Sequence, residues 1–177
     1  MKLRVLKTES DFDADFIDRI LALDKAQMPT ILTEAGIEFP EEKRRGGFKR
    51  NPTFIVAENA GKIAGYLEYT RSWSDGDTIY ISSIQIEKRY RHSKLILRLI
   101  DKFVETVAEE DFRGFETNVQ KNNLPAINLY RKIGFEFNEN PRRSASWRLV
   151  ADRRILDESP VRQLLERWRK RENKQGA

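Results

Sequence analysis

Residues 118–135 read NVQKNNLPAINLYRKIGF, and this stretch decides the fold. Its first residues complete a strand, a polar loop follows, and the apolar residues from Leu124 to Ile133 recur at helical spacing. Gly134 can take the left-handed conformation that ends a helix, and a new strand is expected to start at Phe135. A helix that connects two strands in this way is typical of a sheet with helices packed on its faces.

Working outward, the rest of the chain supplies further strands and helices. Hydrophobic periodicity and turn residues predict strands at residues 3–6, 54–57, 63–70, 78–86, 115–119, 135–138 and 145–150. Helices are predicted from Ser10 or Asp11 to Asp24, near Thr33, over 93–109, over 124–133, and after a cap at Asp157 or Ser159. The charged run from Glu41 to Arg45 is expected to lie in a mobile loop. The pattern predicts an α/β fold with a central mixed sheet flanked by helices.

The residue types that are present limit the chemistry. With 177 residues, the chain has the length of one domain of ordinary size. The absence of cysteine excludes thiolate metal sites, and a single histidine, His92, excludes a multi-histidine site, so no metal is expected. No apolar run reaches the length of about 20 residues that spans a bilayer, and residues 1–10 lack the apolar stretch of a signal peptide. We therefore expect a cytoplasmic protein without membrane contact.

The net charge of +5 comes from the C-terminal fifth of the chain. From Arg142 onward, basic residues outnumber acidic ones about two to one, whereas the rest is nearly neutral. We expect a domain at residues 1–152 and a basic helical extension at residues 153–177. Positions 161, 164, 165 and 168 form an apolar stripe suited to docking on the domain or on a second copy of the chain, as in a homodimer. The charged faces fit either a solvated helix or contact with nucleic acid or an acidic protein surface.

Residues 84–96 read IQIEKRYRHSKLI and form the second informative segment. A strand ends there, a short basic loop follows, and a long helix begins. The first turn of a helix offers unpaired N–H donors and the positive end of its dipole, which together favour phosphate. Arg89, Arg91, His92 and Lys94 add positive charge, and Ser93 is placed to cap the helix or to bond a phosphate oxygen. An ordinary loop before a well-capped helix is the other interpretation.

The segment after residue 118 resembles the CoA-binding motif of the GNAT family of N-acetyltransferases, in which an asparagine precedes Ala-Ile-x-Leu-Tyr and then Lys-x-Gly-Phe. This sequence has Asn122, the run from Ala126 to Tyr130, and the run from Lys132 to Phe135. The order of elements from Leu3 to about Val150 resembles that family too. The resemblance implies a GNAT-like acyl-CoA N-acyltransferase fold, acetyl-CoA as co-substrate, and acetyl transfer to a primary amine of a small molecule or a protein.

The resemblance also assigns the contacts of CoA. The pantetheine arm is expected along the strand at Ile84, Gln85 and Ile86, and Asn122 is expected to bond the CoA arm. The family's pyrophosphate loop, Arg/Gln-x-x-Gly-x-Gly/Ala, corresponds here to Arg91, His92, Ser93, Lys94, Leu95 and Ile96. Lys94 and Ile96 replace the two small residues of that pattern. This departure motivates an alternative, a CoA-binding or partner-binding module with weakened turnover.

The resemblance places Tyr130 as the general acid that protonates the departing thiolate, since a tyrosine titrates near 10 and a thiol near about 8.5. The base is less clear, because the strand 78–86 carries no glutamate before its end. Glu68, on the preceding strand, is the nearest candidate, and Ser83 is able to order a water molecule. Glu68 is alternatively an exposed strand residue, and an amine that arrives deprotonated needs no base.

The acceptor is expected to contact the loops at residues 28–51, 71–77 and 138–144. Glu34, Glu38, Glu41 and Glu42 suit a cationic amine, and Trp73 suits an apolar part of the acceptor. Each is also an ordinary surface residue, so the sequence leaves the acceptor unidentified.

Overall fold

The computed structural model describes residues 1–7, 9–27, 32, 34, 38–50, 52–72, 76–91, 93–158 and 160–175. The chain forms two compact units. The first contains residues 1–71 and 80–109, and the second contains residues 72–79 and 110–177. The expected domain boundary at residue 152 stays a prediction.

The sheet of the first unit contains β1 (Lys2–Leu6), β2 (Thr53–Asn59), β3 (Lys62–Arg71) and β4 (Thr78–Ile86), hydrogen-bonded in that order. β4 belongs to this unit from Tyr80 onward. The pairs β1–β2 and β2–β3 are antiparallel. The β2–β3 hairpin closes through Ala60 and Gly61, whose φ angles are 48° and 75°. Two positive φ angles are what a two-residue turn of this hand requires, so the hairpin predicted from the sequence is confirmed.

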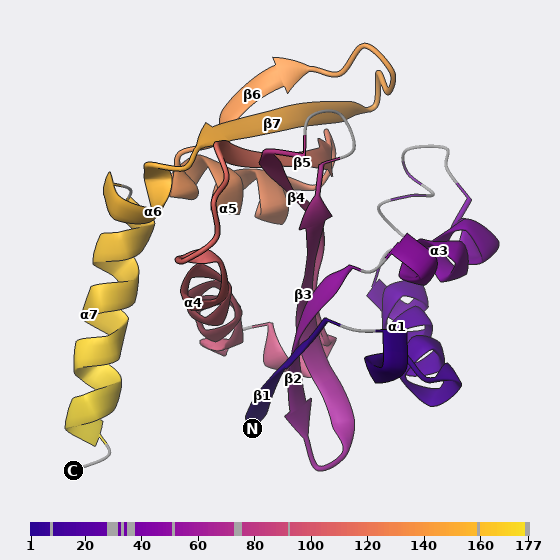
Figure 1. Cartoon of the computed structure of the whole chain (residues 1–177), viewed down its shortest axis with the longest axis horizontal. Coiled ribbons are helices and arrows are strands. Elements are labelled where there is room, and N and C mark those ends of the chain that lie inside the picture. Colours follow the sequence, from indigo (N-terminus) through magenta and orange to yellow (C-terminus); the bar gives the residue numbers. More distant parts are fainter. Residues whose placement is uncertain are drawn as a thin grey trace. The chain divides into compact units, whose positions relative to one another are not determined.

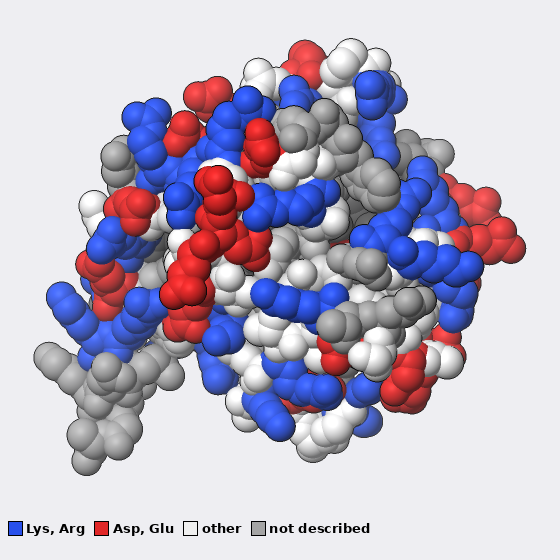
Figure 2. Space-filling view, in the orientation of Figure 1, with Lys and Arg blue, Asp and Glu red and all other residues white. Residues whose placement is uncertain are grey.

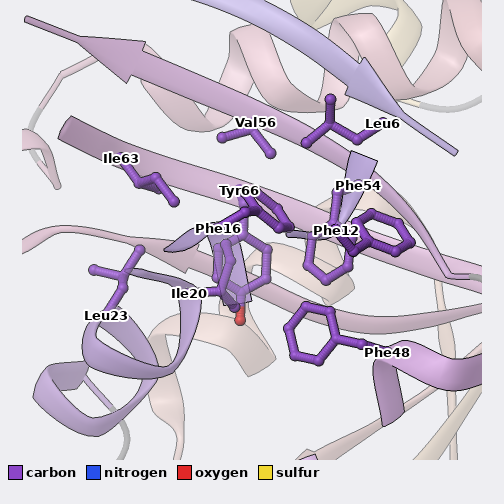
Figure 3. Close-up of a cluster of buried hydrophobic side chains, with 10 residues drawn as sticks. All are labelled: Leu6, Phe12, Phe16, Ile20, Leu23, Phe48, Phe54, Val56, Ile63 and Tyr66. Atoms are coloured by element: carbon purple, nitrogen blue, oxygen red, sulfur yellow. The ribbon is translucent and has the colours of Figure 1, made fainter. Parts of the chain in front are cut away.

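Helices cover both faces of this sheet. On one face lie α1 (Ala14–Gln27) and α3 (Glu41–Gly47), and on the other lies α4 (Leu95–Val107) (Figure 1). Strand alternation explains this arrangement, because Tyr66 belongs to the hydrophobic cluster with α1, while Tyr69 contacts Phe103 of α4 with ring centroids 5.1 Å apart. Figure 3 shows this cluster, in which α1 and the segment after α3 contribute aromatic rings that meet Phe54 and Tyr66.

Two predictions for the N-terminal region are wrong. α1 starts one turn later than expected, because Asp13 provides the cap, its Oδ1 accepting from the N–H of Phe16 at 2.7 Å, while Glu9–Asp11 form a short 3-10 turn, η1. The run expected as a mobile loop is helix α3, followed by the 3-10 turn η2 (Phe48–Arg50). Acidic residues in the first turn of α3 and basic ones in its last turn complement the helix dipole. The helix expected near Thr33 lies outside the described residues.

In the second unit, β5 (Gly114–Gln120), β7 (Ser146–Asp152) and β6 (Glu136–Glu139) are adjacent in that order and pair antiparallel. α5 spans Leu124–Ile133 and ends at Gly134, whose φ is 102°, as the sequence predicts. The chain continues through α6 (Ile155–Glu158), which was not predicted, and α7 (Pro160–Gln175), which packs against α5 and buries Leu165. The predicted strands occur in the predicted order with α1, α4, α5 and α7 between and after them, so the α/β class is confirmed.

No helix among the described residues is long and apolar enough to cross a membrane. The acidic side chains in this part of the chain form no group that could hold a metal ion.

Candidate functional site

A hydrogen-bonded turn precedes the helix at the β4–α4 junction. η3 (Lys88–Tyr90) follows β4 and leads into the loop before α4. Ser93 Oγ donates to the carbonyl of Tyr90 at 2.6 Å and accepts from the N–H of Leu95 at 3.2 Å, so its hydroxyl holds the turn before α4, whose N-cap residue is Lys94 and has no side-chain cap bond. The side chain of Leu95 is 1% exposed and belongs to the core, which leaves only its backbone for a ligand. His92 lies outside the described residues.

The charged side chains of this junction lie at the surface. Arg91 and Lys94 are exposed, and Ile96 is half-buried. Arg91 folds back along the loop, where its Nε donates to the carbonyl of Ile86 at 3.5 Å and its Nη2 donates to Gln27 at the end of α1. The cation assigned to the pyrophosphate therefore lies beside the last residue of α1.

The β2–β3 hairpin contacts this junction through a side-chain hydrogen bond. Asn59 Nδ2 donates to the hydroxyl of Tyr90 at 2.8 Å. The hairpin is itself tied to α1, because Arg19 donates to the carbonyl of Gly61 at 3.3 Å. The loop before α4 is thus anchored at Tyr90.

The end of β4 lies very close to β3. A Cβ atom on Gly65 would lie 2.7 Å from the carbonyl oxygen of Gln85 and 3.3 Å from Cα of Ile86. The N–H of Glu87 donates to the carbonyl of Ala64 at 2.9 Å. The backbone at Gln85 and Ile86, where the pantetheine arm is expected, is therefore fixed by a strand that requires glycine at position 65.

The β5–α5 junction holds the other two predicted residues, Asn122 and Tyr130. Asn123, not Asn122, caps α5, its Oδ1 accepting from the N–H of Ala126 at 3.3 Å. Asn122 lies in the turn before α5, and its side chain is exposed. Tyr130 is 6% exposed and its ring meets Phe135 edge-on at 5.1 Å. The N–H groups of Gly134 and Phe135 both donate to the carbonyl of Tyr130 at 3.1 Å, which fixes the end of α5 around this residue.

A buried charged cluster, which the sequence did not predict, lies between α1, α3 and β3. It contains Asp24, Arg44, Tyr66 and Glu68. The guanidinium of Arg44 is central: Nε donates to Asp24 Oδ2 at 2.8 Å, Nη1 donates to Glu68 Oε1 at 3.1 Å, and Nη2 lies 2.7 Å from Glu68 Oε2 and 3.2 Å from Tyr66 Oη. Asp24 and Tyr66 are 0% exposed and Glu68 is 4% exposed. The alternative that Glu68 is an exposed strand residue is wrong.

The environment of the charged cluster shifts the pKa values of its members. Burial raises the pKa of Glu68 above its ordinary value, against the opposing attraction of Arg44. Burial also raises the pKa of Tyr66 well above 10.0, so its phenol is held in the neutral form. Burial alone would lower the pKa of Arg44, but Tyr66, Glu68 and Asp24 together raise it above its ordinary value. Arg44 is therefore the permanent cation of the charged cluster.

One signal in the sequence points to part of the charged cluster. Asp24 continues the apolar stripe of α1, one turn after Ile20 and next to Leu23, so a charge falls on the buried face. Arg44 gives no such signal, since it stands among the charged residues of α3. Of the other acids considered for an acceptor, Glu41 pairs with Lys25 and Glu42 is exposed.

Two basic residues of α7 have partners close by in the sequence. Arg162 pairs with Asp157 at 3.3 Å and with Glu166 at 3.1 Å, and Arg167 donates to the carbonyl of Gln163 at 3.1 Å. Figure 2 shows acidic side chains interspersed among the basic ones on the face in view. A contact of this helix with nucleic acid or with a second copy stays a prediction.

Comparison with known proteins gives the family of this fold. A model of the acetyltransferase (GNAT) family matches residues 17–135. The chain belongs to the GNAT family.

Among curated GNAT relatives, the putative ribosomal protein bS18-alanine N-acetyltransferase of Bacillus subtilis is 34% identical over 83 residues, which are 47% of this chain and 53% of that protein. The L-2,4-diaminobutyric acid acetyltransferase of Vibrio parahaemolyticus is 25% identical over 81 residues, 46% of this chain and 45% of that one. This chain thus spans about half the length of each curated relative.

Solved GNAT structures confirm the predicted fold. An acetyltransferase of Thermus thermophilus superposes with a TM-score of 0.66 at 13% identity, covering 86% of this chain and 97% of that one. PaiA N-acetyltransferase of Thermoplasma acidophilum, in complex with coenzyme A, also gives a TM-score of 0.66 at 13% identity, covering 86% of this chain and 99% of that one. At this identity the likeness concerns the fold.

Proposed function

We propose that this protein transfers an acetyl group from acetyl-CoA to a primary amine. One observation carries the proposal: the stretch from Asn122 to Phe135, in which the GNAT residues occur in the family's order, forms a strand–loop–helix whose end is closed by a left-handed Gly134. The family match over residues 17–135 supports it.

The residues at the two junctions suit acetyl-CoA. In the proposal, main-chain groups at Ile84, Gln85 and Ile86 bond the pantetheine arm, and Asn122 bonds the same molecule. The diphosphate rests on the backbone of residues 92–96 with Arg91 and Lys94 beside it, since exposed cations at a helix start favour phosphate. Ser93 contributes by holding the turn before the helix, because its hydroxyl is already engaged.

Tyr130 is proposed as the general acid. Acetyl-CoA supplies a thioester whose sulfur leaves as a thiolate, and a phenol can protonate that group as it departs. The packing of Tyr130 against Phe135, and the double hydrogen bond to its carbonyl, restrict where its hydroxyl can point. Replacing Tyr130 with Phe is expected to lower kcat about 100-fold at saturating acetyl-CoA. Full turnover by this variant would contradict the role of Tyr130 as general acid.

Glu68 receives a changed role in this proposal. Both of its carboxylate oxygens face the guanidinium of Arg44, at 3.1 and 2.7 Å, so they are not placed to take a proton directly from an amine. Glu68 instead fixes Arg44, and through Arg44 it positions Asp24 and Tyr66.

The acceptor is proposed to be a primary amine that is cationic in solution. The two curated relatives are named for acetylation of L-2,4-diaminobutyric acid and of an alanine in a ribosomal protein. Both names describe amino groups, and both give usable probe compounds: L-2,4-diaminobutyrate and a peptide that begins with alanine. A cytoplasmic location stays a prediction.

The proposal is tested by calorimetry with acetyl-CoA and by an assay for free thiol in the presence of each amine. Saturable binding together with amine-dependent release of CoA is expected. Binding without release for a broad amine panel would leave a CoA-binding module, and no binding at millimolar acetyl-CoA would contradict the assignment as a whole.

A further inference from the structure

A line of hydrogen-bonded side chains connects β4 with the interior beneath α1. Gln85 Nε2 donates to Ser83 Oγ at 3.3 Å, and Ser83 Oγ lies 3.3 Å from Tyr66 Oη. Tyr66 Oη in turn donates to Asp24 Oδ1. Ser83 is half-buried, whereas Tyr66 and Asp24 are 0% exposed. The line therefore starts on the strand proposed to bond the pantetheine arm and ends at a carboxylate shielded from solvent.

The number of hydrogens on each group fixes the direction of this line. Tyr66 has one hydroxyl hydrogen, which goes to Asp24, and its oxygen accepts from Arg44 Nη2. The 3.3 Å contact with Ser83 is then donated by the serine. Ser83 Oγ also accepts from Gln85, and a hydroxyl oxygen has two lone pairs, so one remains for a further donor. Each hydroxyl thus directs its hydrogen toward Asp24.

Asp24 and Glu68 differ in the groups that bond their carboxylate oxygens. Glu68 faces Arg44 with both oxygens, while Asp24 gives one oxygen to Arg44 and the other to the Tyr66 phenol. Among the residues that the structure describes, the titratable groups that face Asp24 are Arg44 from α3 and Tyr66 from β3, with Glu68 on the far side of Arg44. Because burial raises the pKa of Tyr66, a lasting tyrosinate is disfavoured, and the phenol passes one proton on as it receives another.

We infer that Ser83 accepts a proton from the ammonium form of the acceptor and that Tyr66 and Asp24 act through Ser83 as a relay. This inference rests on the proposed acetyltransferase function. One N–H proton moves to Ser83 Oγ, the serine proton moves to Tyr66 Oη, and the tyrosine proton moves to Asp24 Oδ1. The ammonium becomes a neutral amine and the carboxylate becomes a carboxylic acid.

The free amine then attacks the thioester, so that the C–N bond forms and the C–S bond breaks. The second proton lost by the nitrogen balances the one taken up by the thiolate. Asp24 returns its proton to solvent by the same path after the products leave.

The test uses the alanine-initiated peptide, because its α-amino group has a pKa of about 7.7–8.0 and is charged at low pH but neutral at high pH. Values of kcat/KM are compared at about pH 6.5 and about pH 9.5 for wild type, Ser83→Ala and Tyr66→Phe, with L-2,4-diaminobutyrate as a second acceptor. Both variants are expected to lose about 100-fold at the lower pH and only about twofold at the higher pH, with the KM for acetyl-CoA nearly unchanged. A relay is needed only while the amine carries its extra proton.

Two further variants separate chemistry from folding. Ser82→Ala removes the same group from the adjacent, exposed position on β4 and is expected to behave as wild type at both pH values. Ser83→Thr keeps the hydroxyl and is expected to restore most of the rate. Thermal unfolding in the same buffers shows whether each variant is folded.

Each outcome decides between the two proposals. Equal losses at both pH values, or no loss at the lower one, overturn the relay while the acetyltransferase function stands. A wild-type protein that acetylates neither acceptor contradicts the proposed function, and the relay falls with it.

Discussion

Two neighbouring clusters lie under α1 and α3, and different forces hold them. In the aromatic cluster, Phe12, Phe16, Phe48 and Phe54 meet with centroid distances from 5.4 to 6.4 Å. In the charged cluster, the two carboxylates of Asp24 and Glu68 share the guanidinium of Arg44. Aromatic burial stabilises at any pH, whereas buried charges stabilise only when every partner is present. The two clusters touch, because the Arg44 guanidinium carbon lies 5.1 Å from the Phe48 ring centroid.

The largest effect is expected from Arg44→Met. The methionine keeps apolar volume but leaves two buried carboxylates without their cation, which should reduce the free energy of unfolding by about 5 kcal/mol at neutral pH. Urea denaturation measures the change. The loss should shrink on acidification, because protonated carboxyls no longer need the cation. A loss below about 1 kcal/mol would show that the charged cluster does not depend on Arg44.

Phe54→Ala tests the aromatic cluster. Phe54 is 0% exposed and touches the rings of Phe12, Phe16, Phe48 and Tyr66, so its removal leaves a cavity. The expected loss is about 4 kcal/mol in the free energy of unfolding. Unlike the loss from Arg44→Met, it should be the same at about pH 5 and about pH 8, since no ionisable group is removed. A strong pH dependence would mean that Phe54 acts mainly by shielding Arg44.

Glu68→Gln sharpens the comparison through the sign of its pH dependence. Burial raises the pKa of Glu68 in the folded protein above its ordinary value of 4.5. The folded state therefore binds this proton more tightly than the unfolded chain, and the contribution of Glu68 to stability is lost as pH rises through the folded pKa. The variant should lower the free energy of unfolding by about 1–2 kcal/mol at about pH 5 and by less at about pH 8. Paired urea titrations give the difference, and a cost that grows with pH would contradict the raised pKa.

The smallest effect is expected from Arg45→Met, the matched control for Arg44→Met. Arg45 is the next residue on α3, and its pair with Asp18 at 2.8 Å lies at the surface, with side chains 48% and 62% exposed. Solvent screens such pairs, so the free energy of unfolding should change by less than about 0.5 kcal/mol. A change as large as that of Arg44→Met would show that α3 is held by its surface pairs.

Periodic segments were predictable, and segments held by tertiary contacts were not. β4 and α5 have the predicted bounds, because strand alternation and helical spacing are local properties of the sequence. α3 has no apolar stripe, and its contacts with α1 depend on pairs such as Arg44 with Asp24, 20 residues away in sequence. The two partners of such a pair are far apart in the sequence, and local patterns do not relate them. The sequence therefore predicts a loop for residues 41–45.

The candidate site divides in the same way. The start of a helix just after Ser93 follows from the apolar repeat there, but the N-cap residue is Lys94, and Ser93 bonds the turn before the helix instead. Glu68 was weighed as an exposed residue because one acid on a strand gives no sign of burial. Its environment arises from Arg44, on another element, and only folding brings the two together.

The turn at residues 59–61 has a practical consequence. Short, exposed hairpin tips are the usual places to insert an epitope tag or to open a chain for circular permutation. Here the bond from Asn59 to Tyr90 makes the tip a support for the loop before α4. A peptide inserted at this tip would leave a folded molecule with an unanchored loop, so a fusion made there would disturb the neighbouring junction while passing every check of expression and secondary structure.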